Sequence, residues 1–525
     1  MTSVVLTPRR PRPWSVIRGE PWLRAFAWSG GAGSLLTAIG AFGAGWLAPA
    51  TDVDSWPALQ SLRSQPATKV GAPIAVMAGV AILLVTWLLL GQRLHLHRIT
   101  PQQLARLCLW WGTPLVLAPV LFSRDVFSYI AQSRLLPLGI DPYRHGAGVL
   151  PGYLGDGADL LWRNAPAPYG PAWMGLSSLV YRITGADAIP ALLAFRTLAV
   201  AGVVLIAVFV PKLARACGAD PTAAIWMTVL NPLLLMDLLS AAHNDALMLG
   251  LLVAGISVAM QGRLIPAMVL VSLAGAIKAP ALIGIPFVVL AANKARPGRA
   301  GWVRACAVSG VVVVAVFTAL NLVTGLGWGW LSNLGAPNKV RMWLTPTTAV
   351  GKMLSKSMSL VGLGDPVEPA ISTLRTVGLV VTLAALAWLL VTGRRRTGAR
   401  GLGLALIALA VLAPVMQPWY LLWGVVVLAG AGLRPLESRA AAVATSTLVL
   451  YSGVNVNALA ATRLALKDGP AAAWSLGVVL VVLLAAFVRM RLATSRPGPR
   501  TTSGLGPRER GEPAVDVAAD VQGGD

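Results

Sequence analysis

The sequence has very little charge for its length. Only 12% of its 525 residues are Asp, Glu, Lys or Arg, which is roughly half the share of a soluble domain. By contrast, 56% of the residues are hydrophobic and the mean hydropathy is +0.70. A soluble protein could not bury this many apolar side chains and would expose many of them to water, whereas a lipid bilayer accommodates an apolar surface. The composition therefore excludes an ordinary soluble protein and predicts an all-α polytopic membrane protein.

Acidic residues are scarcer than basic ones. The chain has 20 Asp and Glu residues against 43 Lys and Arg residues. The net charge of +23 does not indicate a nucleic-acid partner, because the basic residues stand in small groups between apolar runs. Five of the acids lie in the last 17 positions: Glu509, Glu512, Asp516, Asp520 and Asp525. The apolar body therefore has few carboxylates, and each one is a candidate for function.

Cysteine and histidine are also rare, with three and four residues respectively. Cys108, Cys217 and Cys306 show no zinc or redox spacing and fall near the predicted cytoplasmic side, so we predict no disulfide. No Walker motif, Rossmann fingerprint or kinase motif set occurs. If the protein is an enzyme, we therefore expect its activated substrate to reside in the membrane.

Apolar stretches that are long enough to cross a bilayer recur along the whole chain. We predict about 13 to 14 spans, with the N-terminus inside because the strong Arg and Lys clusters then all fall in inside loops. The predicted organisation is a basic cytoplasmic N-terminus (1–23), a transmembrane domain (24–489) and a disordered cytoplasmic tail (490–525). The predicted spans are 24–48, 71–91, 102–121, 188–210, 222–241, 246–261, 264–277, 279–292, 303–323, 371–392, 402–414, 419–433, 440–457 and 471–489.

The predicted outside segments are long and rich in aromatic, proline and acidic residues. The two largest cover about 122–187 and 324–370. Within the first, Pro171–Ile183 is apolar but short, and we expect an interfacial or re-entrant helix there. Residues 264–292 are predicted to form two half-length helices around Lys278-Ala279-Pro280. Segments of this kind often border binding sites, because irregular backbone needs a polar cavity.

The first outside loop carries the strongest catalytic candidate. Asp125 follows the third predicted span, at the membrane boundary, where a carboxylate can serve as a general base on a hydroxyl group. The alternative is a structural role, in which Asp125 pairs with Arg124 or caps the next helix. Arg124 itself is a candidate substrate contact.

Two further parts of this loop are candidate substrate contacts. Asp141 and Tyr143 lie in a Gly-Ile-Asp-Pro-Tyr-Arg-His-Gly run, although Asp-Pro often only begins a turn. Tyr169 lies in a proline-rich run and offers an aromatic ring to the face of a sugar. The alternative for this run is a rigid connector.

Polar residues also gather at the ends of later spans. His243, Asn244 and Asp245 stand in a row at the outer end of the fifth predicted span, which favours a site over a simple turn. Lys278 is a lone cation between apolar halves and is a candidate for holding phosphate, with snorkelling as the alternative. Arg341 is a weaker candidate for the same phosphate. For Gln417-Pro418-Trp419-Tyr420 we expect an aromatic-belt role.

These stretches together resemble a known family. RDVFSYIAQSRLLPLGIDPYRHG (124–146), APAPYGPAW (165–173), NPLLLMDLLSAAHNDALMLGLL (231–252) and AGAIKAPALI (274–283) are similar to the actinobacterial polyprenol-phosphate-mannose-dependent α-1,6-mannosyltransferases. Members of this family have the GT-C glycosyltransferase fold and extend the mannan core of lipomannan and lipoarabinomannan. The resemblance covers about 100–430, and the N-terminus and tail look specific to this chain.

The resemblance implies a plasma-membrane enzyme whose site faces the extracytoplasmic side. Its donor would be a polyprenyl-phosphate mannose, and its acceptor would be a lipid-anchored mannoside. The essential Asp of GT-C enzymes maps onto Asp125, as the base of a single displacement with inversion. Lys278, with Arg341 or His243, would hold the leaving phosphate. Many GT-C enzymes have two adjacent acids at this point, but this chain has Arg124-Asp125. A divalent cation is therefore left open as a cofactor, without support from a paired-acid motif, and no other cofactor is predicted.

Three other functions fit parts of the sequence. A transporter or flippase would also have many spans, but it would usually show an internal repeat and charges in mid-span. Asp237, inside the fifth predicted span, is the one carboxylate that fits this reading. A transferase with another lipid-linked donor, such as arabinofuranose, would share the same fold. A non-catalytic partner in an envelope complex is the third alternative.

Overall fold

The computed structural model describes residues 21–48, 55–94, 96, 99–152, 157–293, 298–392 and 398–454. Within these ranges the chain is helical, and β geometry is limited to an isolated bridge between Trp46 and Val120. The predicted all-α class is thereby confirmed. Most of the predicted N-terminal segment (1–23), the last predicted span (471–489) and the predicted tail (490–525) lie outside the described residues.

Five described helices are both long and apolar enough to cross a membrane, and a sixth span results if one sharply bent pair is counted. The five are α1 (Pro21–Ala44), α3 (Pro66–Arg93), α7 (Ala188–Ala216), α12 (Arg299–Thr324) and α14 (Val367–Thr392). The polytopic class is therefore confirmed, although many of the other predicted spans are helices of 17 residues or fewer. Hydropathy does not separate such short buried helices from true spans, because both are apolar throughout.

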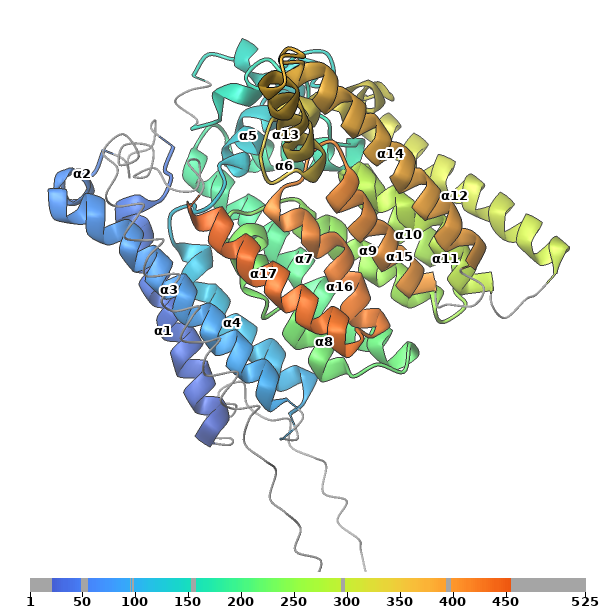
Figure 1. Ribbon diagram of the computed structural model, residues 1–525, viewed down its shortest axis with the longest axis horizontal. Coiled ribbons are helices and arrows are strands. Elements are labelled where there is room, and N and C mark those ends of the chain that lie inside the picture. The colour runs from blue at the N-terminus through green and yellow to red at the C-terminus, as the bar shows by residue number, and fades with distance from the viewer. Residues whose placement is uncertain are drawn as a thin grey trace, which may run out of the picture.

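The remaining helices are shorter and make up much of the interior (Figure 1). They are α2 (Pro57–Ser64), α4 (Pro101–Leu117), α5 (Asp125–Ser133), α6 (Pro171–Thr184), α8 (Pro221–Met227), α9 (Asp245–Ala259), α10 (Leu264–Ile277), α11 (Gly284–Ala292), α13 (Pro346–Leu360), α15 (Gly398–Leu412), α16 (Leu421–Ala431) and α17 (Pro435–Val454). α9 and α16 are buried on almost every side. The core thus lies around these two helices and α7, which packs against both.

The first long helices associate through small residues. α1 packs along α3 and α4 and forms one flank of the molecule in Figure 1. A Cβ atom added to Gly79 of α3 would lie 2.3 Å from the Thr37 side-chain oxygen and 2.5 Å from the Gly33 carbonyl oxygen of α1. The two backbones therefore approach as closely as they do because glycine occupies these positions, as is common where helices pack in lipid.

The opposite flank presents apolar surface to its surroundings. α12 and α14 are both seen at the edge of the bundle that is farthest from α1 in Figure 1. In their most apolar stretches only 11% and 22% of the residues, respectively, are buried. Valine and leucine side chains such as Val311, Leu322 and Val323 are largely exposed. Such a surface suits hydrocarbon rather than water.

The predicted break at Lys278 is confirmed. α10 ends at Ile277, Lys278 adopts an extended conformation with φ −149° and ψ 125°, and a 3-10 turn over Ala279–Ile283 leads into α11. Pro280 lies in this turn, where its ring and missing N–H prevent a regular helix. The Lys278 side chain is thereby placed at the junction of two short helices.

The predicted continuous span at 222–241 is wrong. α8 ends at Met227, a π-helical segment covers Leu234–Ser240, and the chain then turns by 110° into α9. The interruption between α8 and the π-helical segment contains Asn231-Pro232: the Asn231 side chain accepts a hydrogen bond from the N–H of Leu233 and donates one to Thr445. Asparagine and proline at this position compete with regular helical hydrogen bonds, which hydropathy does not register.

Both predicted outside segments carry helices, and these lie at the same end of the molecule. α5 and α6 belong to the segment 122–187 and α13 to 324–370, and the three are found together at the top of Figure 1. The apolar stretch Pro171–Ile183 is a helix as predicted, within α6. The placement of α6 relative to a membrane stays a prediction.

Candidate active site

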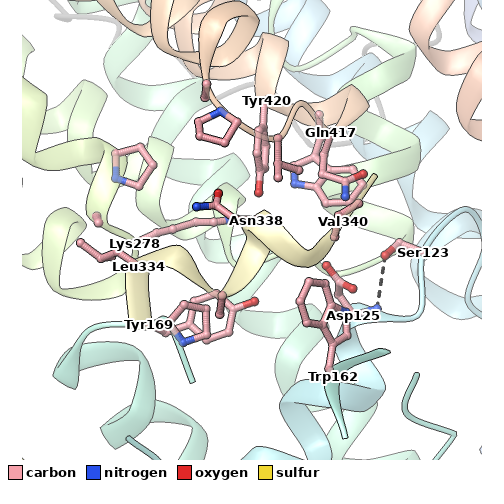
Figure 2. Close-up of a pocket in the computed structure, with 18 of the residues that line it drawn as sticks. Ser123, Asp125, Trp162, Tyr169, Lys278, Leu334, Asn338, Val340, Gln417 and Tyr420 are labelled. Atoms are coloured by element: carbon pink, nitrogen blue, oxygen red, sulfur yellow. Dashed lines mark hydrogen bonds between the residues drawn. The ribbon is translucent and has the colours of Figure 1, made fainter. Parts of the chain in front are cut away.

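A cavity of about 620 Å³ lies where the two large segments meet the break at Lys278. Two parts of the first predicted outside segment (122–187) contribute to its wall, namely its first residues and its proline-rich run. The turn after α10, the chain at 334–342 and the turn that leads into α16 form other parts of the wall. Figure 2 shows Asp125 and Lys278 on opposite sides of this space, with Asn338 and Val340 between them in that view. Residues more than 150 positions apart in the sequence thus share one site.

Asp125 is the first residue of α5, and its side chain is 28% exposed toward the cavity. Its N–H donates a hydrogen bond to the Ser123 side-chain oxygen at 3.2 Å, and its Oδ2 lies 3.7 Å from Nδ1 of His243. Burial raises the pKa of the Asp125 carboxyl to about 6, against the opposing effect of the Lys278 charge. Near pH 7 the group is therefore an ionised carboxylate whose pKa suits a general base.

Arg124 lines the cavity, but its charge is directed to a second acid. Its Nη2 lies 2.5 Å from Oδ2 of Asp159, and its guanidinium stacks over the Trp46 ring at 4.4 Å. Asp159 also lines the cavity. The tertiary structure thus brings a second carboxylate to the wall near Asp125, although the neighbouring residue in the sequence is an arginine.

His243 lies directly behind the wall and is completely buried. Its ring stacks on Trp419 with centroids 3.9 Å apart, and neither ring nitrogen has a hydrogen-bond partner. The preceding Ala242 has φ 57°, a left-handed conformation that is unfavourable for a residue other than glycine. Phe122, three residues before Asp125, has φ 70°. Backbone strain of this kind often clusters at functional sites, and here it flanks both members of the Asp125–His243 contact.

The turn that carries His243 is tied down by an arginine from a long helix. Arg196 of α7 is 2% exposed and donates hydrogen bonds to the carbonyl oxygens of Val116 at 2.6 Å and Ser240 at 2.9 Å. The adjacent Asn244 accepts a hydrogen bond from the Tyr129 hydroxyl at 3.4 Å. Arg196 was not singled out from the sequence, although it lies inside the predicted span 188–210, where a charged residue is itself a signal of function.

Lys278 enters the cavity with its charge already paired. Its Nζ lies 2.7 Å from Oδ2 of Asp245, which is completely buried at the start of α9. The other carboxylate oxygen of Asp245 accepts a hydrogen bond from Nε1 of Trp423 at 2.7 Å. The ammonium group also lies 5.1 Å from the Tyr420 ring centroid. An ammonium has three N–H donors, so Lys278 retains donors for an anion in the cavity.

Tyr169 completes the wall on the side of the first segment. Its ring meets Tyr129 edge to face at 5.6 Å, and burial raises the pKa of its phenol. The neutral hydroxyl and the ring face are therefore available as a polar and an aromatic surface for a sugar. Figure 2 shows Tyr169 below the chain segment that carries Leu334.

The structure does not bring every predicted contact to this cavity. Asn244 and Asp245 lie behind the wall and not in it. Asp141 accepts a hydrogen bond from the N–H of Tyr143, which is the turn-forming role considered above. Tyr143 packs against the backbone at 329, and Arg341 pairs with Glu368 at 2.9 Å on the outside. The substrate-contact predictions for these residues therefore gain no support from the cavity.

The expected aromatic-belt role of Gln417-Pro418-Trp419-Tyr420 is wrong. All four residues line the cavity, and Trp419 is only 6% exposed.

Asp237 was also noted from the sequence. It is completely buried, and its Oδ2 accepts a hydrogen bond at 3.4 Å from Ser452, which lines the cavity. Within the described part of the chain, no three His, Cys, Asp or Glu residues gather in a way that could hold a metal ion.

The fold and the cavity define a polytopic membrane protein in which the carboxylate of Asp125 and the ammonium group of Lys278 line one cavity. Residues 27–294 match the family described as "Alpha-(1->6)-mannopyranosyltransferase, N-terminal domain", and residues 347–486 match the "MptB C-terminal domain". The chain belongs to the alpha-(1->6)-mannopyranosyltransferase family.

Individual relatives agree with this assignment. The chain is 33% identical to a probable alpha-(1->6)-mannopyranosyltransferase of Mycolicibacterium smegmatis, over 94% of this chain and 92% of that protein. It is 32% identical to an alpha-(1->6)-mannopyranosyltransferase of Mycobacterium tuberculosis, over 88% and 87%. It is also 30% identical to alpha-(1->6)-mannopyranosyltransferase B of Corynebacterium glutamicum, over 78% and 73%. The similarity thus extends well beyond the predicted range of 100–430 in both directions.

Proposed function

We propose that this protein transfers mannose from polyprenyl-phosphate mannose to a lipid-anchored mannan acceptor, forming an α-1,6 linkage. The transfer takes place on the extracytoplasmic face of the plasma membrane, in lipomannan and lipoarabinomannan synthesis. The observation that carries the proposal is a single cavity lined by both Asp125 and Lys278 in a chain of the alpha-(1->6)-mannopyranosyltransferase family.

Asp125 acts as the general base. It removes the proton from the 6-hydroxyl of the acceptor as that oxygen attacks the anomeric carbon of the donor. The bond between the anomeric carbon and the phosphate oxygen breaks in the same step, with inversion at that carbon. The carboxylate is suited to this role because it faces the cavity and its pKa lies close below neutral pH.

Lys278 stabilises the polyprenyl phosphate as it leaves. The buried Asp245 holds the ammonium group in place and is itself held by the indole N–H of Trp423, so little reorganisation is needed when negative charge develops on the phosphate. Donors fixed at such a position lower the barrier more than mobile ones. Asp245 thus positions Lys278 and does not itself bind substrate.

The composition of the wall suits a lipid-linked donor. Near Lys278 it includes the apolar residues Pro280 and Ile283, and farther along Leu379 of α14 and Leu409 of α15. Leu379 is 46% exposed on a helix whose surface is mostly apolar and open. A prenyl chain would therefore remain in apolar surroundings while its phosphate reaches the ammonium group.

The decisive test is transfer by the purified protein in lipid vesicles. Radiolabelled polyprenyl-phosphate mannose and a short α-1,6-mannoside are supplied, and linkage analysis identifies the bond in the product. We expect α-1,6 extension by the wild type and a loss of roughly 100- to 10,000-fold in Asp125→Asn, the usual range for removing a general base. Transfer from polyprenyl-phosphate arabinose alone, or undiminished transfer by Asp125→Asn, would contradict the proposal.

A further inference from the structure

A strap of chain crosses the cavity between Asp125 and Lys278. We use this name for residues 333–342, which run from within the 3-10 segment Gly329–Lys339 toward α13. In Figure 2 the strap passes from Leu334, beside Lys278, to Val340, on the side of Asp125. The residues of the strap that line the cavity are Leu334, Ala336, Asn338, Val340 and Met342.

One end of the strap is fixed to the first outside segment. The side-chain amide of Asn333 donates hydrogen bonds to the carbonyl oxygen of Tyr143 at 2.9 Å and to that of Ala167 at 3.3 Å. Ala167 directly precedes Pro168 and Tyr169, which line the cavity. This end of the strap is therefore joined to the wall that carries Tyr169.

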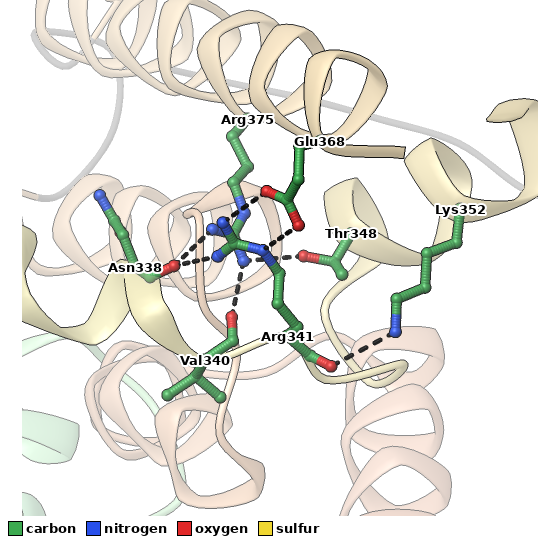
Figure 3. Close-up of polar contacts among 7 residues, drawn as sticks. All are labelled: Asn338, Val340, Arg341, Thr348, Lys352, Glu368 and Arg375. Atoms are coloured by element: carbon green, nitrogen blue, oxygen red, sulfur yellow. Dashed lines mark hydrogen bonds and ion pairs between the residues drawn. The ribbon is translucent and has the colours of Figure 1, made fainter. Parts of the chain in front are cut away.

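The other end is fixed by one buried arginine of α14. Arg375 is 8% exposed, and its two terminal nitrogens donate to the carbonyl oxygens of Asn338 and Val340, each at 2.8 Å (Figure 3). One of these nitrogens also donates to the Thr348 side chain of α13 at 3.0 Å. The planar guanidinium can hold two carbonyl groups and a hydroxyl in fixed relative positions, which an ammonium group cannot do equally well.

A second contact lies outside this one. Arg341 of the strap pairs with Glu368, which lies about two helical turns before Arg375 on α14. Glu368 is 67% exposed, and an ion pair of this kind contributes little to stability. Arg375 therefore dominates the attachment of the strap at this end.

We propose that Arg375 is a positioning residue that holds the strap over the reacting carbon and so keeps water from it. This inference rests on the proposed mannosyl transfer. In transfer, the acceptor oxygen bonds to the anomeric carbon, the bond to phosphate breaks, and the hydroxyl proton passes to Asp125. Water can follow the same course and gives free mannose and polyprenyl phosphate. A closed wall favours the acceptor because it limits the entry of water.

The ratio of hydrolysis to transfer tests this role directly. Purified protein in lipid vesicles is given labelled donor and a mannoside acceptor, and labelled mannoside and free mannose are both counted. We expect Arg375→Gln to lower transfer on the order of tenfold, because a displaced wall misplaces the reactants. The fraction of label released as free mannose rises several-fold. Arg375→Lys regains part of the loss, and Lys356→Gln, an exposed change on α13, matches the wild type.

A second variant tests the wall without touching the arginine. Val340→Ala opens the strap beside Asp125 and leaves the carbonyl partners of Arg375 in place, so it also raises the share of free mannose. It carries the test if Arg375→Gln does not yield a folded, monodisperse protein. An unchanged share of free mannose in a folded Arg375→Gln would overturn the inference, and so would an unchanged share in Val340→Ala if the arginine variant does not fold. A wild type that transfers no mannose would instead contradict the proposed function.

Discussion

At the scale of single residues, the charged groups around Asp125 have opposing effects on its pKa. Lys278 draws its pKa down, while Asp245 and Asp159 push it up and burial adds the largest upward effect. Arg124, whose guanidinium is held to Asp159, also lowers the pKa of Asp125. The protonation of Asp125, the proposed base, is therefore set by its neighbours as well as by its depth.

This balance predicts the pH dependence of the reaction. A base works only when it has lost its proton, so kcat/KM should fall as the pH decreases through about 6, the pKa of Asp125. The measurement is the pH profile of kcat/KM for the donor, in vesicles with a saturating concentration of acceptor. A flat profile from pH 5 to pH 8 would show that Asp125 is not the titrating base.

Two substitutions should move this profile in opposite directions. Asp245→Asn removes a negative charge that raises the pKa of Asp125, so the acidic limb shifts to lower pH. Lys278→Met removes a positive charge that lowers it, so the limb shifts to higher pH. Both variants should also transfer more slowly, because Asp245→Asn loosens and Lys278→Met removes the ammonium group that is proposed to hold the phosphate. Shifts of the same sign in both variants would contradict the assigned geometry.

At the scale of elements, the molecule depends on helices that break or approach closely at particular residues. The break at Lys278 and the bend before α9 place polar groups at the cavity instead of in lipid. α1 and α3 lie in backbone contact because glycine occupies both sides of their interface. Close contact of this kind leaves no room for even one added methyl group.

The contact between α1 and α3 can be tested with a matched pair of glycines. Gly79→Ala should destabilise the protein by about 1–3 kcal/mol, since its Cβ would meet atoms of Thr37 and Gly33 that cannot move freely. Gly71→Ala in the same helix meets nothing within 4 Å and should be neutral or slightly stabilising. Thermal unfolding of both variants in detergent is the measurement, and equal midpoints would contradict the close contact.

At the scale of the whole molecule, the polar machinery gathers at one end of an apolar body. The cavity, the strap and helices α5, α6 and α13 occupy that end, while α12 and α14 present apolar surface at the flank. In the proposed reaction, a lipid-borne donor would reach this site from the side and a mannoside would reach it from the aqueous phase. The charge pattern of the loops predicts that this end is extracytoplasmic.

Sidedness can be tested by labelling single cysteines in intact cells. The three native cysteines are first replaced by serine, which is practicable because the chain has only Cys108, Cys217 and Cys306. Ser357→Cys on α13 should react with a membrane-impermeant maleimide. Gln261→Cys, between α9 and α10, should react only after the membrane is opened. Both positions are exposed, so the opposite pattern would place the cavity on the cytoplasmic side.

The sequence by itself determined the features that are local along the chain. Apolar composition predicted a polytopic helical protein, Pro280 with Lys278 predicted two half-helices, and the position of Asp125 after an apolar run made it the candidate base. These predictions depend on hydropathy and on the backbone limits of proline, which a few neighbouring residues are enough to define.

Only the tertiary structure decided which residues meet. It placed Asp245 beneath Lys278 as its ion partner and brought Asp159 to the cavity wall. It turned Trp419 inward onto His243, and it set Arg375 behind the strap while Arg341 remained outside. The physical reason is that the partner of a charge is chosen by packing across long sequence separations. The hydropathy pattern of the sequence can show that a charged residue lies in an apolar segment. It does not show which oxygen atom or aromatic ring the side chain of that residue will contact.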